Sequence, residues 1–193
     1  MNLDEVRKET KKANLPLKEG HNLVFGRGKS DADILFIGEA PGKNEDEQGL
    51  PFVGRAGKVL QKNIEETNIT SYYIANILKY RPPNNRDPKK NEIEKHTPYL
   101  IKQIQAIKPK IICTLGNYST KFVLAGFTTK NMNKQPGIST IRGETKTVKL
   151  QNTSYTILPI YHPAATLYNP TLRPLFKEDL KKAKRLTTQQ KIS

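Results

Sequence analysis

Residues suited to ligand binding and to hydrolysis are concentrated in one stretch of the chain. Residues 38–42 read Gly-Glu-Ala-Pro-Gly, residues 45–47 are all acidic, and residues 51–57 read Pro-Phe-Val-Gly-Arg-Ala-Gly. Glycine lets the backbone approach a ligand closely, a carboxylate can position water, and Phe52 offers a flat face for a base. From these residues alone, the stretch is either a ligand-binding loop, such as a phosphate cradle, or merely a tight turn. It is not a Walker loop, because no Gly-Lys-Ser/Thr triplet opens the following helix.

Two further segments carry reactive side chains. Residues 79–86 read Lys-Tyr-Arg-Pro-Pro-Asn-Asn-Arg, and residues 162–165 read His-Pro-Ala-Ala. The cations of the first segment could meet phosphate, and the second segment places His162 at the end of a predicted strand, beside a proline-fixed turn.

Four apolar runs are expected to form the strands that carry these segments. Each is short, rich in β-branched residues and mostly continuous, which is typical of strands covered on both faces. The runs span residues 33–38, 72–78, 110–115 and 155–161. Helical patterns lie between them at residues 55–67, 88–107 and 118–124, and Pro98 is expected to interrupt or kink the second.

Strands that alternate with helices predict an α/β fold, a three-layer α/β/α arrangement with a four-stranded parallel sheet. Ligand-binding residues of such sheets cluster at the carboxyl ends of the strands, where the three segments stand. We expect a single domain over residues 1–193, with its core at about 23–172. Residues 130–147 are expected to form a surface hairpin or loop, and residues 173–193 a basic C-terminal tail that ends as a frayed helix.

Composition narrows the class of protein. The 33 Lys and Arg against 18 Asp and Glu give a net charge of +15, which favours a polyanionic partner such as nucleic acid, although a basic surface could also serve solubility alone. No apolar stretch reaches the roughly 18 residues that span a bilayer, and the N-terminus lacks the apolar centre of a signal peptide, so we expect a soluble, cytoplasmic protein. A single cysteine, Cys113, excludes an internal disulfide and any cysteine-built metal or iron–sulfur site within one chain.

The motifs occur in a fixed order: GEAPG, an acidic run, PFVGRAG, Asn76 followed by Lys79 and Arg81-Pro-Pro, and a late His162-Pro-Ala. In this order, from about residue 23 to 172, the chain resembles the family 4 uracil-DNA glycosylases of bacteria and archaea. The resemblance implies a monofunctional enzyme that uses water to hydrolyse the N-glycosidic bond of deoxyuridine in DNA. Uracil-containing DNA is the implied partner, and we expect the protein to be a monomer.

The resemblance assigns three residues to the base. Phe52 would stack on the flipped uracil, which has lost its neighbours in the duplex. Asn76 would read the Watson–Crick edge, its amide NH₂ donating to O4 and its carbonyl accepting from N3–H, a pattern that cytosine reverses. His162 would face O2 and stabilise the charge of the leaving base. The alternatives are a core phenylalanine, a buried asparagine bonded to the backbone, and a structural histidine.

The first motif supplies two carboxylates and the rest of the substrate loop. Glu45 matches the acid that positions or activates the attacking water, and Glu39 is expected to orient the loop. Gly38 and Ala40 are expected to lie against the substrate. Ala40 stands where family 1 enzymes carry a catalytic Asp, so the anionic group must come from elsewhere or catalysis must depend mainly on leaving-group stabilisation.

Other residues are expected to hold the DNA. Leu167, with Tyr168 beside it, is the candidate wedge that fills the space left by the flipped base. The expected phosphate contacts are Arg55, Lys79, Arg81 and Arg86. The alternative for each of these cations is an ordinary solvated charge.

The chain departs from its family at one point. Most members hold an iron–sulfur cluster on four cysteines, and none of the four is present here. Tyr80 and His96 stand at two of the positions, where packing is expected to replace the cluster, and His96 is expected to be a partly exposed helix residue. No cofactor and no metal are therefore expected. Two other functions remain open: a glycosylase for another modified or deaminated base, because selectivity depends on few contacts, and a catalytically silent DNA-binding protein of the same fold.

Overall fold

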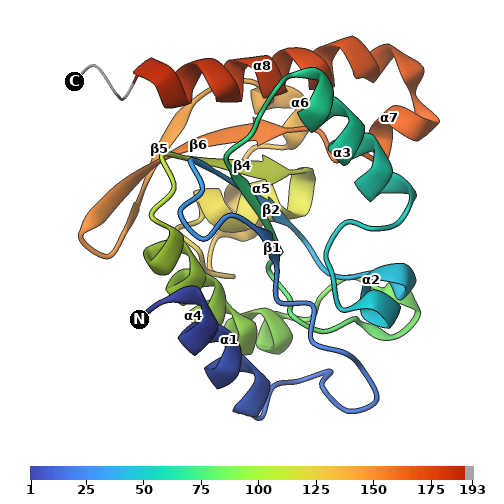
Figure 1. Cartoon of the computed structure of the whole chain (residues 1–193), viewed down its shortest axis with the longest axis vertical. Helices are drawn as coiled ribbons and strands as arrows, with labels where there is room; N and C mark the ends of the chain where they lie inside the picture. The colour runs from blue at the N-terminus through green and yellow to red at the C-terminus, as the bar shows by residue number, and fades with distance from the viewer. Residues whose placement is uncertain (190–193) are drawn as a thin grey trace.

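A six-stranded mixed sheet forms the centre of the fold, as the computed structural model of residues 1–189 shows (Figure 1). The strand order is β1-β3-β2-β4-β6-β5. The strands are β1 (Arg27–Gly28), β2 (Ile34–Gly38), β3 (Tyr72–Asn76), β4 (Ile111–Leu115), β5 (Lys146–Leu150) and β6 (Thr153–Ile160). Strands β3, β2, β4 and β6 are parallel to their neighbours in this set, whereas β1 and β5 pair antiparallel at the two edges. The four predicted parallel strands are confirmed, and the two edge strands are an addition to them.

Helices cover both faces of this sheet. The main ones are α1 (Leu3–Lys12), α3 (Arg55–Glu66), α4 (Lys90–Ile107), α5 (Asn117–Leu124) and α8 (Arg173–Gln189). Ile34 and Phe36 of β2 pack in a core with α3 and α8, whereas Leu35 and Ile37 pack in a second core with α4 and α5. Figure 1 shows α3 and α8 above the sheet and α1 and α4 below it. The predicted three-layer α/β/α fold is thereby confirmed.

The C-terminal segment differs from its prediction as a basic tail. Helix α8 packs on the sheet, and Phe176, Leu180 and Ala183 are fully buried. These residues recur at helical spacing and form an apolar stripe, but the lysines and arginines between them dominate the composition of the segment. The core therefore extends past residue 172, and also reaches back to the buried Val6 of α1. Residues 190–193 of the predicted tail lie outside the described residues.

Two further segments refine the sequence-based prediction. Helix α4 continues through Pro98, so the predicted interruption of the helix does not occur. The proline ring lies on the exposed face of the helix. The polar segment 130–147 contains the short turn η2 (Met132–Lys134), helix α6 (Ile138–Ile141) and the start of β5, which forms a hairpin with β6.

The parallel strands β2, β3 and β6 all end on the side of the molecule that carries the shorter elements. These elements are α2 (Lys43–Gln48), the turn η1 (Pro83–Asn85) and α7 (Ala165–Tyr168). Figure 1 places α2 and α7 at its right, away from the N-terminus. The motifs predicted to carry chemistry therefore converge there.

The single cysteine lies away from this edge. Cys113 is buried at the middle of β4, where burial raises the pKa of its thiol.

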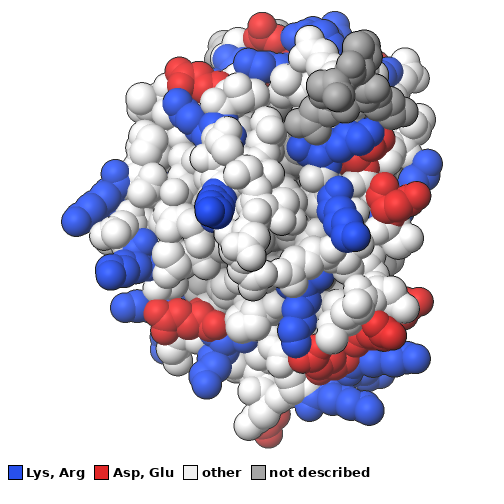
Figure 2. All heavy atoms as spheres, turned by 90° about the vertical axis from the view of Figure 1, so that its left-hand side faces the viewer, with Lys and Arg blue, Asp and Glu red and all other residues white. Residues whose placement is uncertain are grey.

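Charge is distributed broadly over the opposite side. Figure 2 shows that side, with lysine and arginine side chains spread across it and acidic side chains between them. The net charge of +15 is therefore not concentrated in one patch on this face. Among residues 1–189, no helix has both the length and the apolar character needed to cross a membrane.

Candidate active site

A cavity of about 600 Å³ opens at the carboxyl ends of β2, β3 and β6. It brings together seven of the predicted site residues, namely Glu39, Ala40, Glu45, Phe52, Asn76, Arg86 and His162. Pro41, Gly42, Ala56, Pro82, Asn85, Ala164 and Tyr168 complete its lining. Gly38 lies just behind the wall, at the end of β2.

Asn76 ends β3 with its side chain directed at this cavity. The residue is only 2% exposed, and its buried Oδ1 atom has no hydrogen-bond partner within the described part of the chain. A buried polar atom left without a partner costs about 1–3 kcal/mol. A Cβ atom on Gly38 would stand 2.4 Å from this oxygen and 2.7 Å from the Phe52 ring, so only glycine permits the arrangement. The orphaned oxygen is best explained by a ligand that supplies a donor.

Phe52 is held in a strained conformation. Its φ of 54° lies in the left-handed region, which bulky side chains rarely adopt. The guanidinium group of Arg27 donates hydrogen bonds to Pro51 O (2.9 Å) and Phe52 O (3.2 Å). Gly57 allows the close approach of the Phe52 carbonyl, because a Cβ there would stand 1.9 Å from its oxygen. These contacts fix the ring against the cavity, where its centroid lies 5.7 Å from that of His162.

His162 presents a neutral donor. Its Nδ1 accepts a hydrogen bond from the backbone N–H of Ala164 (3.2 Å), so the proton of the neutral ring resides on Nε2. Burial lowers the pKa of His162 to about 4, although nearby Glu45 acts in the opposite direction. The ring is therefore neutral at pH 7. Gly116 has a φ of 90° and allows this packing, since a Cβ there would stand 2.9 Å from the Cβ of His162.

The two carboxylates of the first motif differ in their surroundings. Glu45, on α2, accepts hydrogen bonds on Oε1 from the backbone N–H groups of Val53 (2.9 Å) and Gly54 (2.8 Å). It therefore ties down the loop that carries Phe52. Burial raises the pKa of Glu39 to about 7, and nearby Asp87 adds to this shift. Glu39 is thus poised to gain or lose a proton near neutral pH.

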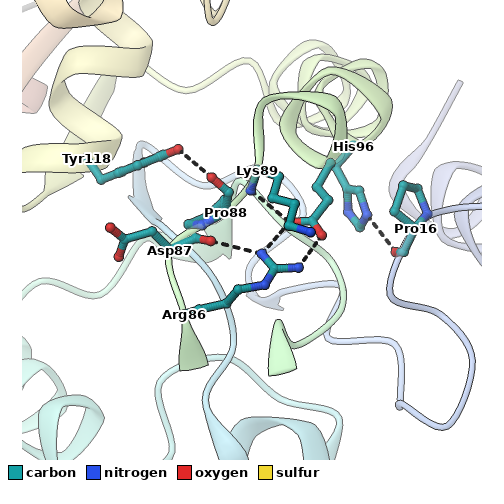
Figure 3. Close-up of polar contacts among 8 residues, drawn as sticks. Pro16, Arg86, Asp87, Pro88, Lys89, His96 and Tyr118 are labelled. Atoms are coloured by element: carbon teal, nitrogen blue, oxygen red, sulfur yellow. Dashed lines mark hydrogen bonds and ion pairs between the residues drawn. The ribbon is translucent and has the colours of Figure 1, made fainter. Parts of the chain in front are cut away.

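The segment between β3 and α4 forms another wall and is anchored by polar contacts (Figure 3). The guanidinium group of Arg86 donates two hydrogen bonds to the carboxylate of Glu92, at 2.9 and 2.5 Å. The hydroxyl group of Tyr118 donates to Pro88 O (3.1 Å). Arg86 therefore lines the cavity, but its charge is already paired with a buried carboxylate.

The prediction that His96 is partly exposed is wrong. It is fully buried in α4, and burial lowers its pKa to about 4. Its Nδ1 accepts from the backbone N–H of Lys79 (2.8 Å), and its Nε2 donates to Pro16 O (3.1 Å; Figure 3). The rings of His96 and Tyr80 pack edge to face. Both ring nitrogens are thus engaged with the backbone, which joins the N-terminal segment to the sheet.

The comparison with known families agrees with this geometry. Residues 25–185 match the family model of the uracil DNA glycosylase superfamily. The chain belongs to this superfamily. The matched region includes every cavity residue named above, and it runs from just before β1 to the last turn or so of α8.

Several curated members of the superfamily are similar over most of the chain. The type-4 uracil-DNA glycosylase of Saccharolobus solfataricus is 45% identical over an alignment of 194 positions, which covers 98% of this chain and 87% of that protein. The enzyme of the same name from Sulfurisphaera tokodaii is 45% identical over 173 residues, covering 88% of this chain and 77% of the relative. The type-4 uracil-DNA glycosylase of Archaeoglobus fulgidus is 42% identical over 163 residues, covering 83% of this chain and 80% of the relative.

The prediction that Lys79 contacts DNA phosphate is wrong. Its ammonium group is completely buried behind the cavity and cannot reach phosphate. Leu167 does not line the cavity either. It lies half-buried in a separate hollow beside Val59 and Phe176, and so it is poorly placed for the predicted wedge.

Two other predicted phosphate contacts remain predictions. Arg55 is exposed at the start of α3. Arg81 is half-buried, and its Nε donates a hydrogen bond to Asn85 (2.8 Å).

Sequence reasoning missed the residues that support the site from behind. Arg27 and Gly57 position Phe52, and Gly116 makes room for His162. Gly57 carried a signal, because it lies within the PFVGRAG motif, and Gly116 directly follows a predicted strand. Arg27 stands in a segment, Val-Phe-Gly-Arg-Gly, that resembles the family, but nothing in it assigned the arginine to the site, since an arginine is usually solvated.

Proposed function

We propose that this protein is a uracil-DNA glycosylase that removes uracil from DNA during base excision repair by hydrolysing the N-glycosidic bond. The observation that carries the proposal is the buried, unpartnered Oδ1 of Asn76 in the same cavity as Phe52 and His162. The 45% identity to curated type-4 uracil-DNA glycosylases over nearly the whole chain supports it.

The cavity suits a base that has left the DNA stack. Phe52 supplies a face for stacking, and the Asn76 side chain supplies a carbonyl acceptor for N3–H and an amide donor for O4. The Nε2–H of His162 can donate to O2, where negative charge grows as the glycosidic bond breaks. A donor fixed in a water-poor site stabilises such charge strongly, because it needs no reorganisation during the reaction.

The surroundings of the two carboxylates favour Glu39 as the group that positions the attacking water. Glu45 Oε1 is occupied by two backbone donors, so the loop-holding role first expected of Glu39 fits Glu45 better. No side-chain hydrogen bond joins Glu39 to another residue among 1–189, and its pKa of about 7 suits a proton acceptor.

We therefore expect the wild-type cleavage rate to fall as the pH drops through about 7, where the Glu39 carboxylate becomes protonated. Glu39→Gln should lower the rate at pH 8 by about 10²–10⁴-fold and abolish this pH dependence. Glu45→Gln is the matched control and should keep it. Single-turnover rates from pH 6 to 8 measure both, and a persistent acid limb in Glu39→Gln would assign the titration to another group.

A direct test of the function uses an oligonucleotide with a single uracil, followed by alkali cleavage of the resulting abasic site. We expect strand scission at the uracil position only, with uracil released and with no loss of activity in EDTA. Parallel substrates carrying hypoxanthine, xanthine or 5-hydroxymethyluracil test the broader specificity. Binding without release of any base would support the catalytically silent alternative and overturn the proposal.

We propose that the enzyme works without a cofactor. The residues present do not fit the iron–sulfur cluster of the family, because the single cysteine is buried in β4 and both nitrogens of His96 are bonded to the backbone. We also propose that it acts as a cytoplasmic monomer. The large hydrophobic side chains exposed among residues 1–189 are only Met1, Leu50 and Tyr168, too few for an extensive apolar interface.

Tyr168 is the side chain best placed to contact DNA beside the flipped base. It is 83% exposed at the end of α7 and lines the cavity mouth. Stacking of an aromatic ring on a base is worth about 1–3 kcal/mol. Because the chain has no tryptophan, Tyr168→Trp introduces a single tryptophan, whose emission can be excited apart from that of the tyrosines.

We expect the fluorescence of Tyr168→Trp to be quenched when uracil-containing DNA binds, because the indole stacks on a base. Tyr99→Trp, on α4 and outside the cavity lining, is the control and should show little change. Tyr168→Ala should weaken DNA binding at least about fivefold, and Tyr168→Phe should not. Unchanged fluorescence and affinity would show that Tyr168 does not touch the DNA.

A further inference from the structure

Lys79 is a fully buried lysine directly behind the base-reading residue. It follows β3 by three positions, and its side chain folds back so that Nζ donates to the backbone carbonyl of Asn76 (2.7 Å). Nζ also donates to Gln103 Oε1 (2.5 Å), on α4. The Gln103 side chain is itself fixed by donating from Nε2 to Phe25 O (2.8 Å).

The energetics of this placement are unfavourable for a purely structural residue. Its polar partners are a carbonyl and an amide oxygen, and no carboxylate within residues 1–189 forms an ion pair with it. A buried ammonium group without an opposite charge is costly, and a methionine or leucine would fill the same space at lower cost. Burial lowers the pKa of Lys79 to about 7. A costly group in contact with a functional residue indicates a role in function.

The position of the contact indicates what that role is. Asn76 is the last residue of β3. The peptide that follows it is held at its N–H by a hydrogen bond from Ile77 to Gly38 O (3.0 Å), and its carbonyl oxygen, on the other side, accepts from Lys79 Nζ. The Asn76 side chain has no hydrogen bond through Oδ1 that could orient it. The hydrogen bond from Lys79 to the Asn76 carbonyl therefore restrains the backbone from which the base-reading amide projects.

We propose that Lys79 is a positioning residue that holds Asn76 in the orientation that reads uracil, with its ammonium group as the donor that fixes the Asn76 peptide. The proposal rests on the proposed function of the cavity. The neutral amine is a weaker donor than the ammonium ion, so deprotonation loosens this restraint.

The groups around Lys79 leave few other sources of pH dependence. His96 accepts from the Lys79 backbone N–H and has a pKa of about 4, and burial raises the pKa of Tyr73, which contacts Gln103, to about 12. Neither titrates between pH 6 and 9. Glu39, in the cavity, does titrate there, so the measurements below use the Glu39→Gln background.

The test compares binding to two DNAs, one with a non-hydrolysable 2′-fluoro-deoxyuridine and one with a tetrahydrofuran abasic analogue. Lys79→Met keeps an unbranched side chain that is one atom shorter and removes the donor. We expect it to weaken binding to the uracil-analogue DNA about tenfold and to leave binding to the abasic analogue within about twofold. Gln103→Met is the matched control, since it removes the second partner of Lys79 and spares the contact with Asn76; it should keep the wild-type ratio.

A second variant keeps the inference testable if Lys79→Met does not fold. Gln103→Glu places a carboxylate beside the ammonium group and should hold Lys79 charged to higher pH. Affinity for the uracil-analogue DNA should therefore decline between pH 7 and 9 in the reference protein and stay flat in Gln103→Glu. Equal loss on both DNAs in Lys79→Met, or identical pH profiles, would overturn the inference. Failure of the wild type to release uracil would instead refute the proposed function.

Discussion

Replacing His162 by alanine is expected to slow uracil release about 10²–10³-fold in single-turnover experiments. The ring is neutral at pH 7, because burial lowers its pKa to about 4, and the Ala164 N–H occupies Nδ1. Nε2–H is thus the only donor of this side chain that can face the base. The charge that it stabilises develops only as the bond breaks, so the loss falls on the chemical step.

Binding measurements separate this role from a structural one. His162→Ala should bind abasic DNA with nearly wild-type affinity, because no leaving base is present there. His162→Gln, which can keep a donor near the same position, should recover part of the rate. Rates for His162→Ala within a few-fold of the wild type would require the assigned role of His162 to be abandoned.

Changing Asn76 to aspartate is expected to relax the discrimination between uracil and cytosine by at least about 10²-fold. The site is almost closed to solvent, so an introduced carboxyl group should be protonated over much of the neutral range. A protonated carboxyl group can donate to cytosine N3 and accept from its N4 amino group, and it no longer offers an NH₂ donor to uracil O4.

Single-turnover rates on matched oligonucleotides containing uracil or cytosine measure this ratio. Asn76→Ala is the control, because it removes the contact without creating a new pattern, and should lose activity on uracil without gaining any on cytosine. An aspartate variant that loses uracil activity and still ignores cytosine would show that selectivity lies elsewhere in the cavity.

The predictions from sequence succeeded where local pattern and global fold agree. The four central strands are continuous apolar runs, and the carboxyl-end rule for parallel sheets then placed Glu39, Asn76 and His162 in one cavity. The edge strands β1 and β5 were not predicted, because one has two residues and the other, Lys-Thr-Val-Lys-Leu, has only two apolar residues and lies in a segment with the composition of a loop.

The errors arise where side-chain direction depends on distant parts of the chain. Lys79 stands in a basic segment and was predicted to contact phosphate, but it is buried by partners that include Gln103, 24 residues further along the chain. In the four-residue helix α7, each position is rotated by about 100° from the last. The sequence could not settle the phase, and so Leu167 was preferred to Tyr168.

The burial of Cys113 has a practical consequence for experiments on this enzyme. Thiols react with alkylating reagents and oxidants mainly as thiolates, and this one is both inaccessible and held in its protonated form. The native chain is therefore expected to be inert toward maleimide reagents while it stays folded. A cysteine introduced at the cavity mouth would be the sole reactive thiol, so probes of DNA bending could be attached there without first building a cysteine-free background.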